Sequence, residues 1–187
     1  MKKSVFLFTA MMLLFSVFQM KAQSPIDKIY EKYAGQDGFT AVNLTKEMFQ
    51  MFQQMKIGDS SDAEIKSARQ IVDQLNAIKV LMFKFDSTNF LKAVSYYNEF
   101  AAGYSSKDYK ELMTVQEGRQ HVKFLTKSSA TGKVSEFVML MKDKNEVGVI
   151  SLTGNIDLAN ISNMSKFMNI KGMENLKKMK RQHDTKH

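Results

Sequence analysis

The sequence predicts an α+β fold: a mixed, mainly antiparallel sheet of about five strands with amphipathic helices packed against it. Three observations predict it. Apolar residues recur at helical spacing in several segments before residue 103. Two strand-like runs, at 39–44 and 78–85, separate these segments. From residue 109 onward the apolar spacing changes to a period of two, as it does in strands that are joined by short turns.

The fold is predicted to begin with a short helix over 25–33. Pro25 suits the first position of a helix, and apolar residues follow it at helical spacing. Gly35 and Gly38 then mark a turn. The run 39–44 is predicted to be the first strand of the sheet.

A second helix is predicted after Thr45, which occupies the position of an N-cap. Its apolar residues are spaced i, i+3, i+4 and i+7: Met48, Met51, Phe52 and Met55. We expect these side chains to face the core, because methionine commonly fills irregular cores. Methionine surfaces also bind varied apolar partners, so the same four residues are the first candidates for a partner-binding patch.

The next part of the chain is predicted to contain a helix, a central strand and a further helix. A polar loop from residue 59 leads into an amphipathic helix that ends near Leu75. The run 78–85 is apolar on both faces, which is typical of a central strand that is covered on both sides. The segment 86–103 is predicted to be a helix that is capped by its first three residues. Its apolar stripe consists of Phe90, Leu91, Val94, Tyr97 and Ala101.

Three strand candidates follow, at 119–128, 133–143 and 146–155. Their short connecting turns predict an antiparallel meander. The long connections between the earlier strands also permit one parallel pair. Asp157 is placed to cap a closing helix, whose apolar side would contain Leu158, Ile161, Met164 and Met168.

The N-terminus has the residue order of a secretory signal peptide. Lys2 and Lys3 precede an apolar run of about 14 residues, which is shorter than the roughly 20 that a membrane-spanning helix needs. We expect cleavage after Ala22 and export to the periplasm or the cell surface. The predicted organisation is a signal peptide over 1–22, a single α+β domain over 23–168 and a basic tail over 169–187.

Charge and cysteine content exclude several classes of function. The chain contains no cysteine, which excludes disulfides, thiolate metal sites and a lipid-anchoring cysteine. Its net charge is +8, but the residues between the predicted signal peptide and Lys166 carry equal numbers of acidic and basic side chains. The excess charge therefore lies near the two ends, and no nucleic-acid partner is expected.

Groups that could act in catalysis are few. His121 is the only histidine before the tail, and no phosphate-binding glycine loop, nucleophilic serine motif or zinc-binding helix accompanies it. Four acidic residues could supply the carboxylate pair of a hydrolase, although each also fits a cap or a solvated strand position: Asp86, Glu99, Glu136 and Asp157. We therefore predict that the protein is not an enzyme and binds no cofactor or metal. A hydrolytic enzyme with a carboxylate pair is the alternative.

The basic tail and one serine are further candidate sites. If the tail is helical, four of its basic residues could contact an anionic membrane surface: Lys177, Lys178, Lys180 and Arg181. A protein that adheres to the membrane surface through this tail is a second alternative. His183 and His187 are spaced i, i+4, but no third metal ligand is evident. Ser87 lies in an Asp-Ser-Thr sequence that resembles the O-glycosylation acceptor pattern of secreted Bacteroidota proteins.

Four stretches of the sequence resemble one protein family: YAGQDGFTAVNLTKEMF, IKVLMF, YKELM and GKVSEFVMLMKDKNEVGVISLTGNIDLANISNM. These stretches are similar to the secreted Bacteroidota proteins that are grouped as a domain of unknown function, family 4252. The resemblance covers about residues 25–168 and leaves the basic tail outside. It implies a small domain exported to the envelope, without assigned catalytic residues. Neighbouring genes in that family imply a link to regulators of extracytoplasmic-function sigma factors.

The function that these observations predict is that of an exported, non-enzymatic binding module of the bacterial cell envelope. Its partner would be an unidentified envelope protein or peptide, with weak contact to an anionic membrane surface as a further expectation. The sequence leaves the identity of the ligand and the oligomeric state open.

Overall fold

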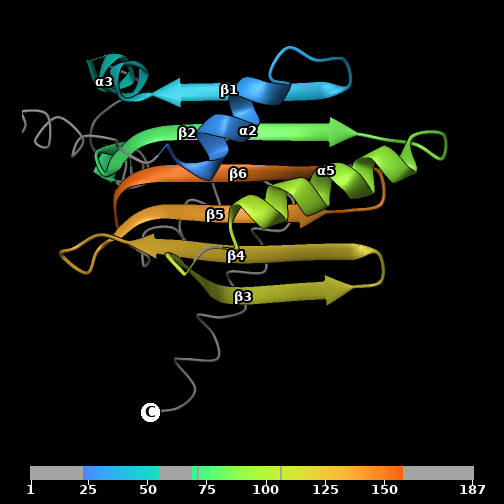
Figure 1. Ribbon diagram of the computed structural model, residues 1–187. Helices are drawn as coiled ribbons and strands as arrows, with labels where there is room; N and C mark the ends of the chain where they lie inside the picture. The colour runs from blue at the N-terminus through green and yellow to red at the C-terminus, as the bar shows by residue number, and fades with distance from the viewer. Residues whose placement is uncertain (1–22, 55–68, 71, 106, 158–187) are drawn as a thin grey trace, which may run out of the picture.

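The computed structural model describes residues 23–54, 69–70, 72–105 and 107–157. These residues form a six-stranded sheet with helices packed against it (Figure 1). The predicted α+β class is confirmed, with six strands in place of about five. Every strand pair in the described sheet is antiparallel, so the parallel pair that the sequence permitted does not form. No described helix combines the length and the apolar character that crossing a membrane requires.

The chain crosses the sheet once and then returns. The elements follow in the order α2 (Pro25–Tyr33), β1 (Phe39–Thr45), α3 (Lys46–Gln54), β2 (Leu75–Lys84), α5 (Phe90–Gly103), β3 (Tyr109–Glu117), β4 (Gln120–Ser128), β5 (Val134–Lys142) and β6 (Glu146–Ile156). The strand order across the sheet is β1-β2-β6-β5-β4-β3. Helix α5 carries the chain from β2 to the far edge, and the meander from β3 to β6 returns it to the side of β2 (Figure 1).

The glycine turn before β1 forms as predicted. Gly35 and Gly38 adopt φ angles of 87° and 83°, which favour glycine because a side chain is strained there. A Cβ on Gly38 would also lie only 2.8 Å from Cε2 of Phe83. The turn therefore fixes where β1 begins, and Phe39 pairs with Phe83 at the start of the register with β2.

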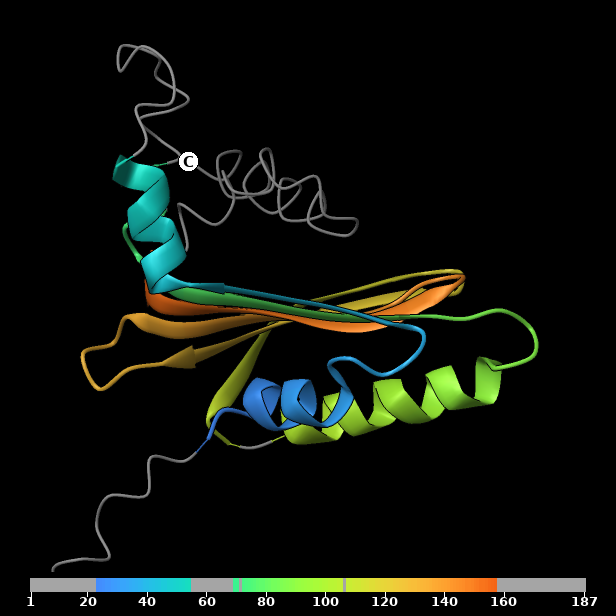
Figure 2. The same ribbon diagram turned by 90° about the horizontal axis from the view of Figure 1, so that it is seen from above.

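The sheet separates two apolar cores. Helices α2 and α5 lie against one face, and α3 extends from the other face at the β1 edge (Figure 2). Along β5 the side chains alternate between the two cores, with Val138 and Leu140 under α5 and with Phe137, Met139 and Met141 on the opposite face. All five of these side chains are buried, which is why β5 reads as a continuous apolar run.

Helix α5 buries only part of the predicted stripe: Tyr97 is buried as expected and Ala101 packs against the core. Its buried side chains are Ala93, Tyr97 and Phe100, whereas Phe90 and Leu91 are 49% and 81% exposed. The small side chain of Ala93 allows the helix to lie close to the sheet, and this contact selects the face. The cap is also different: the helix begins after Asn89, and Asp86 bonds to Thr88 within the preceding loop.

One further predicted boundary was wrong, and one strand was missed. Leu75 begins β2 and is buried in the sheet, where the sequence predicted the end of a helix. Strand β3 was not among the predicted strands, although the period-two spacing was noted from its first residue, Tyr109; most of its side chains are exposed, so it lacks the apolar run of the other strands. The two-sided apolar run of β2, in contrast, lies between β1 and β6 as expected of a central strand.

Several sequence predictions concern residues outside the described part of the chain. These are the signal peptide over 1–22 with its cleavage after Ala22, most of the helix predicted before Leu75, the closing helix over 158–168 and the tail over 169–187. Met55, the four basic tail residues, His183 and His187 also lie outside the described residues. All of these remain predictions.

Candidate functional site

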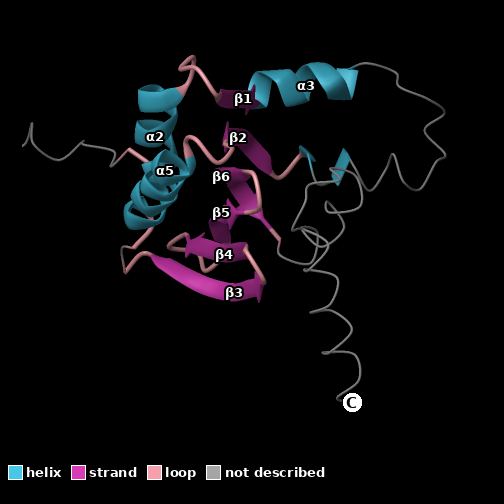
Figure 3. Cartoon of the chain, turned by 90° about the vertical axis from the view of Figure 1, so that its right-hand side faces the viewer, coloured by secondary structure: helices cyan, strands magenta, loops and turns pink. Residues whose placement is uncertain are grey.

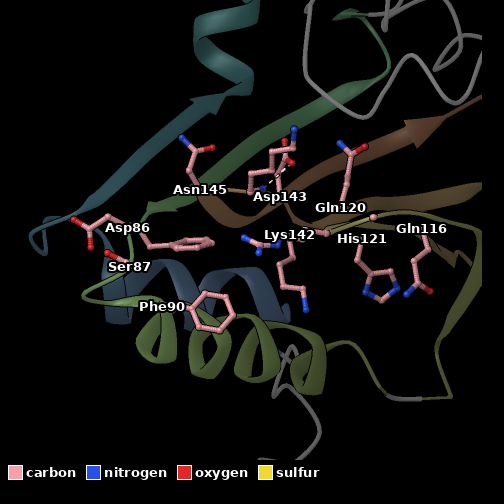
Figure 4. Close-up of a pocket in the computed structure, with 13 residues that line it drawn as sticks. Asp86, Ser87, Phe90, Gln116, Gln120, His121, Lys142, Asp143 and Asn145 are labelled. Atoms are coloured by element: carbon pink, nitrogen blue, oxygen red, sulfur yellow. Dashed lines mark hydrogen bonds between the residues drawn. The ribbon is translucent and has the colours of Figure 1, made fainter.

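A cleft of about 830 Å³ lies at one end of the sheet, a size within the usual range for ligand pockets (Figure 4). Three connections line it: the loop from β2 to α5, the turn between β3 and β4, and the turn between β5 and β6. The strand register brings them together. Lys84 at the end of β2 pairs with Glu146, and His121 at the start of β4 pairs with Lys142 at the end of β5.

Two aromatic rings form an apolar wall of the cleft. Phe85 follows the end of β2, Phe90 begins α5, and their ring centroids are 5.8 Å apart. Phe90 is half exposed and lies on the α5 side of the cleft (Figure 4). Because a ring this exposed gains little from burial in the protein itself, it is available to an apolar or aromatic part of a ligand.

Positive charge exceeds negative charge in the cleft. Arg119, Lys142 and Lys144 line it together with two carboxylates, Asp86 and Asp143. None of the ion pairs among the described residues involves these three cations.

Both carboxylates of the cleft are engaged by their own loops. Asp86 accepts hydrogen bonds from the Thr88 backbone N–H at 2.8 Å and the Thr88 hydroxyl at 2.6 Å, and these bonds lower the pKa of Asp86. Asp143 accepts one from the Lys144 N–H at 2.7 Å. These neutral donors occupy oxygens of the carboxylates without removing their charge, whereas Arg119 and Lys144 form no ion pair in the described part of the chain and are left for a ligand.

His121 lies in the cleft beside Tyr97. The Tyr97 hydroxyl is 3.0 Å from Nδ1 of His121, and Nζ of Lys142 is 5.4 Å from the Tyr97 ring centroid. Burial lowers the pKa of His121, and the charges of Lys123 and Lys142 lower it further. The imidazole is therefore neutral at pH 7 and shares a hydrogen bond with the Tyr97 hydroxyl. Protonation would add a further positive charge to the cleft.

The structure places the four predicted carboxylates in separate environments. Asp86 lines the cleft, whereas Glu99 on α5 pairs with Lys32 at 2.7 Å and accepts a hydrogen bond from Tyr33 at 2.6 Å. Asp157 follows the end of β6, and its N–H donates to the Gln74 side chain. The second carboxylate of the cleft is Asp143, which the sequence did not single out.

Glu136 is buried under the start of α2, with 4% of its surface exposed. Its carboxylate accepts hydrogen bonds from the hydroxyls of Tyr109 and Ser151 at 2.7 Å and from that of Ser24 at 3.1 Å. These donors come from three other parts of the chain: the residue before α2, β3 and β6. Glu136 therefore joins α2 to the sheet, and its role in this geometry is structural.

The predicted methionine patch on α3 is partly exposed. Met48 and Met51 are 42% and 59% exposed, and Phe49 is the side chain that enters the core. The expectation that these two methionines face the core was wrong. Helix α3 follows β1 at the edge of the sheet (Figure 3), and its main contacts in the described part of the chain are with β1 and β2, so a narrow stripe is buried. The side chain of Phe52 lies outside the described residues, as Met55 does.

Ser87 is exposed and lines the cleft from the loop between β2 and α5 (Figure 4). The predicted accessibility of this loop is therefore confirmed, while its glycosylation stays a prediction. No group of acidic or histidine residues in the described chain has a geometry that would hold a metal ion.

Comparison with known proteins shows which family the chain belongs to. A family model described as "Domain of unknown function (DUF4252)" matches residues 30–164, most of the chain. The chain belongs to the DUF4252 family. A crystal structure of LppA from Mycobacterium tuberculosis, a candidate lipoprotein, is similar at 16% identity and a TM-score of 0.27, over 70% of this chain and 68% of that one. No curated protein matches the chain.

Membership of the DUF4252 family confirms the resemblance that the sequence showed. The matched range contains every strand of the sheet and all three turns that line the cleft. The residues that line the cleft thus all belong to the matched range, whereas the basic tail over 169–187 follows that range in the sequence.

Proposed function

We propose that this protein is an exported, non-enzymatic binding module of the bacterial cell envelope, which binds an anionic segment of a partner polypeptide. One observation carries the proposal: a cleft at the end of the sheet combines an aromatic wall with three cations that form no ion pair among the described residues. Export is supported by the signal-peptide pattern at the N-terminus. The link to an envelope response is supported by the family resemblance alone.

The chemistry of the cleft favours an acidic peptide that also carries an aromatic or apolar side chain. Arg119 and Lys144 would attract carboxylates, and the rings of Phe85 and Phe90 would contact the apolar side chain. Carboxamide groups also line the cleft and can bond to a peptide backbone: Gln116, Gln120 and Asn145. A cleft built in this way selects an extended, negatively charged segment.

The alternative of a carboxylate-pair hydrolase receives less support. General acid catalysis at neutral pH needs a carboxyl group whose pKa is raised. Hydrogen bonds from Thr88 instead lower the pKa of Asp86, one of the two carboxylates in the cleft. Asp86 is therefore ionised at neutral pH and is suited to hold its loop.

The proposal is tested with the protein purified after export. Peptides that carry two or three acidic residues, with and without a phenylalanine, are titrated into labelled protein and followed by NMR chemical shifts. We expect the shifts to gather at the turns that line the cleft, and the affinity to fall as salt is added. The phenylalanine-containing peptides should bind more tightly than those without.

A matched pair of double variants separates the cleft from general charge. Arg119→Gln with Lys144→Gln removes two cleft cations, whereas Lys28→Gln with Lys133→Gln removes the same charge from exposed positions elsewhere. The first variant should bind at least about tenfold more weakly, which is about 1.4 kcal/mol, and the second should bind as the natural protein does. The proposal would be overturned if both double variants lost the same amount of peptide affinity, or if no peptide bound to the natural protein.

A further inference from the structure

The two free edges of the sheet are built differently. Strand β3 carries Lys110, Glu111 and Glu117, and its register with β4 is interrupted by a bulge after Glu111. Charges and bulges of this kind discourage a sheet edge from pairing with another strand. Strand β1 has the sequence FTAVNLT, without a charged residue or proline, and its register with β2 is regular from Phe39 to Thr45. The β1 edge therefore lacks these protections.

The backbone of β1 presents hydrogen-bonding groups outward. The Lys84 N–H donates to the Gly38 carbonyl at 3.2 Å, so in the antiparallel ladder alternate residues after Gly38 face β2. Ala41 and Asn43 alternate with the residues that bond to β2, so their N–H and C=O groups point away from the sheet. In the described part of the chain no strand pairs with this side of β1. Side chains along the edge are also accessible, with Val42 39% exposed.

We propose that β1 is a self-association edge, at which a second copy of this chain pairs antiparallel with the first about a two-fold axis. The N–H and C=O groups of Ala41 and Asn43 face outward, and pairing over the whole strand from Phe39 to Thr45 then gives the register in which Val42 lies opposite Val42 of the second copy. Ala41 of each copy then forms a hydrogen-bonded pair with Asn43 of the other. The two sheets become one continuous sheet through the edges that carry no charge.

The charges that flank β1 fit a second copy as the occupant. In this register Asp37, before the strand, lies opposite Glu47 in the first turn of α3 of the second copy, where the neighbouring Lys46 and the N-terminus of the helix attract a carboxylate and offset the repulsion. Glu47 in the same turn already accepts a hydrogen bond from Thr45 of its own copy. The same pairing at the β3 edge would bring charged residues of both signs and a bulge into the interface.

The ladder is short, about 23 Å at 3.3 Å per residue, so the dimer should be weak and concentration-dependent. Analytical ultracentrifugation of the protein purified after export, over a concentration series up to about 1 mM, measures it. We expect a reversible monomer–dimer equilibrium. A monomer at every concentration would overturn the proposal, whether or not other proteins add a strand to the same edge.

Two lysine variants test which edge pairs. Val42→Lys places like charges opposite each other at the two-fold axis, whereas Leu112→Lys adds the same charge at the β3 edge. The two side chains are matched, with exposed fractions of 39% and 38%. We expect the dimer dissociation constant to rise at least about tenfold for Val42→Lys and to stay unchanged for Leu112→Lys. Equal effects would contradict the proposed edge.

Two further variants exclude a loss of folding as the cause. Mixing Val42→Lys with Val42→Glu should restore a heterodimer, because opposite charges then meet at the axis. Ala41→Pro removes only an outward N–H, so the β1–β2 ladder and the thermal midpoint should be kept while dimerisation is lost. A mixture that stays monomeric, or a dimer that survives Ala41→Pro, would rule the register out.

Discussion

At the scale of the residue, Glu136 shows how one buried carboxylate holds separate parts of the chain. Its three hydroxyl donors come from Ser24, Tyr109 and Ser151, and none of the ion pairs among the described residues includes it. A lone glutamate in an apolar strand could be recognised from the sequence, and it was considered for catalysis. Its donors could not be recognised, because they lie 112, 27 and 15 positions away in the chain.

Replacing this carboxylate by an amide should destabilise the protein. Glu136→Gln substitutes an N–H₂ donor for an oxygen that accepts hydrogen bonds, so at least one buried hydroxyl loses its acceptor. We expect the free energy of unfolding to fall by about 1 to 3 kcal/mol, measured by urea denaturation. Glu117→Gln, at an exposed position of β3, is the control and should change it by less than about 0.5 kcal/mol. Equal values for the two variants would contradict the structural role of Glu136.

His121 should give the stability a pH dependence of definite sign. Its pKa in the folded protein lies below the ordinary value of 6.5, so the unfolded chain binds the proton more readily. The stability that the neutral imidazole contributes is complete above about pH 6.5 and is lost as the pH falls through the lowered folded pKa. We expect His121→Gln to reduce the difference in unfolding free energy between about pH 7.5 and pH 5.

The control for this pH effect is the natural chain, which has the same His183 and His187 as the variant. A pH dependence that is the same with and without His121 would contradict the lowered pKa. In the cleft the same protonation adds positive charge. Binding of acidic peptides should therefore strengthen as the pH falls towards 5.5 or so, and the strengthening should be smaller in His121→Gln.

At the scale of the element, α3 and α5 show why a helical stripe read from sequence can have the wrong phase. In both helices, large apolar residues occur at several positions around the helix, and the sheet decides which of them are covered. In α5 the covered face includes Ala93, and in α3 the covered face includes Phe49 in place of Met48 and Met51. Periodicity predicted that these helices exist, but contact geometry set their orientation.

The orientation of α3 predicts opposite outcomes for neighbouring residues. Phe49→Ala should lower the free energy of unfolding by about 3 kcal/mol or more, because a buried aromatic ring is replaced by a cavity. Met51→Ala should change it by less than about 0.5 kcal/mol, because that side chain is 59% exposed. Chemical denaturation of both variants measures the difference. A larger loss for Met51→Ala would show that α3 packs on its other side.

At the scale of the whole molecule, the class and the meander could be predicted, while the cleft could not be assembled from its parts. The turns between β4 and β5 and between β5 and β6 are short, so their antiparallel pairing follows from the sequence. In a meander, every second turn lies at the same end of the sheet, and this rule places Arg119 and Lys142 together. The sequence could therefore have indicated that these two cations are neighbours. The missing information was strand β3 and the path of α5, which bring Gln116 and Phe90 to that end.

Amide hydrogen exchange should reveal both the layered core and the free edge. Amides of β5 and β6 should exchange most slowly, because their side chains are buried on both faces of the sheet. In β1 the N–H groups of Thr40 and Val42 face β2 and should be protected at every concentration. Those of Ala41 and Asn43 face outward and should exchange quickly in dilute solution.

Raising the protein concentration should slow exchange at Ala41 and Asn43 selectively, because these N–H groups form the bonds between the two copies. Protection at Val42 should change little, since its partner in β2 is the same in monomer and dimer. An increase in protection from exchange that is spread evenly along β1 would instead indicate a general increase in stability. An increase in protection that is confined to the outward-facing amides is specific to strand addition at this edge. If no such increase is seen at about 1 mM protein, self-association is contradicted.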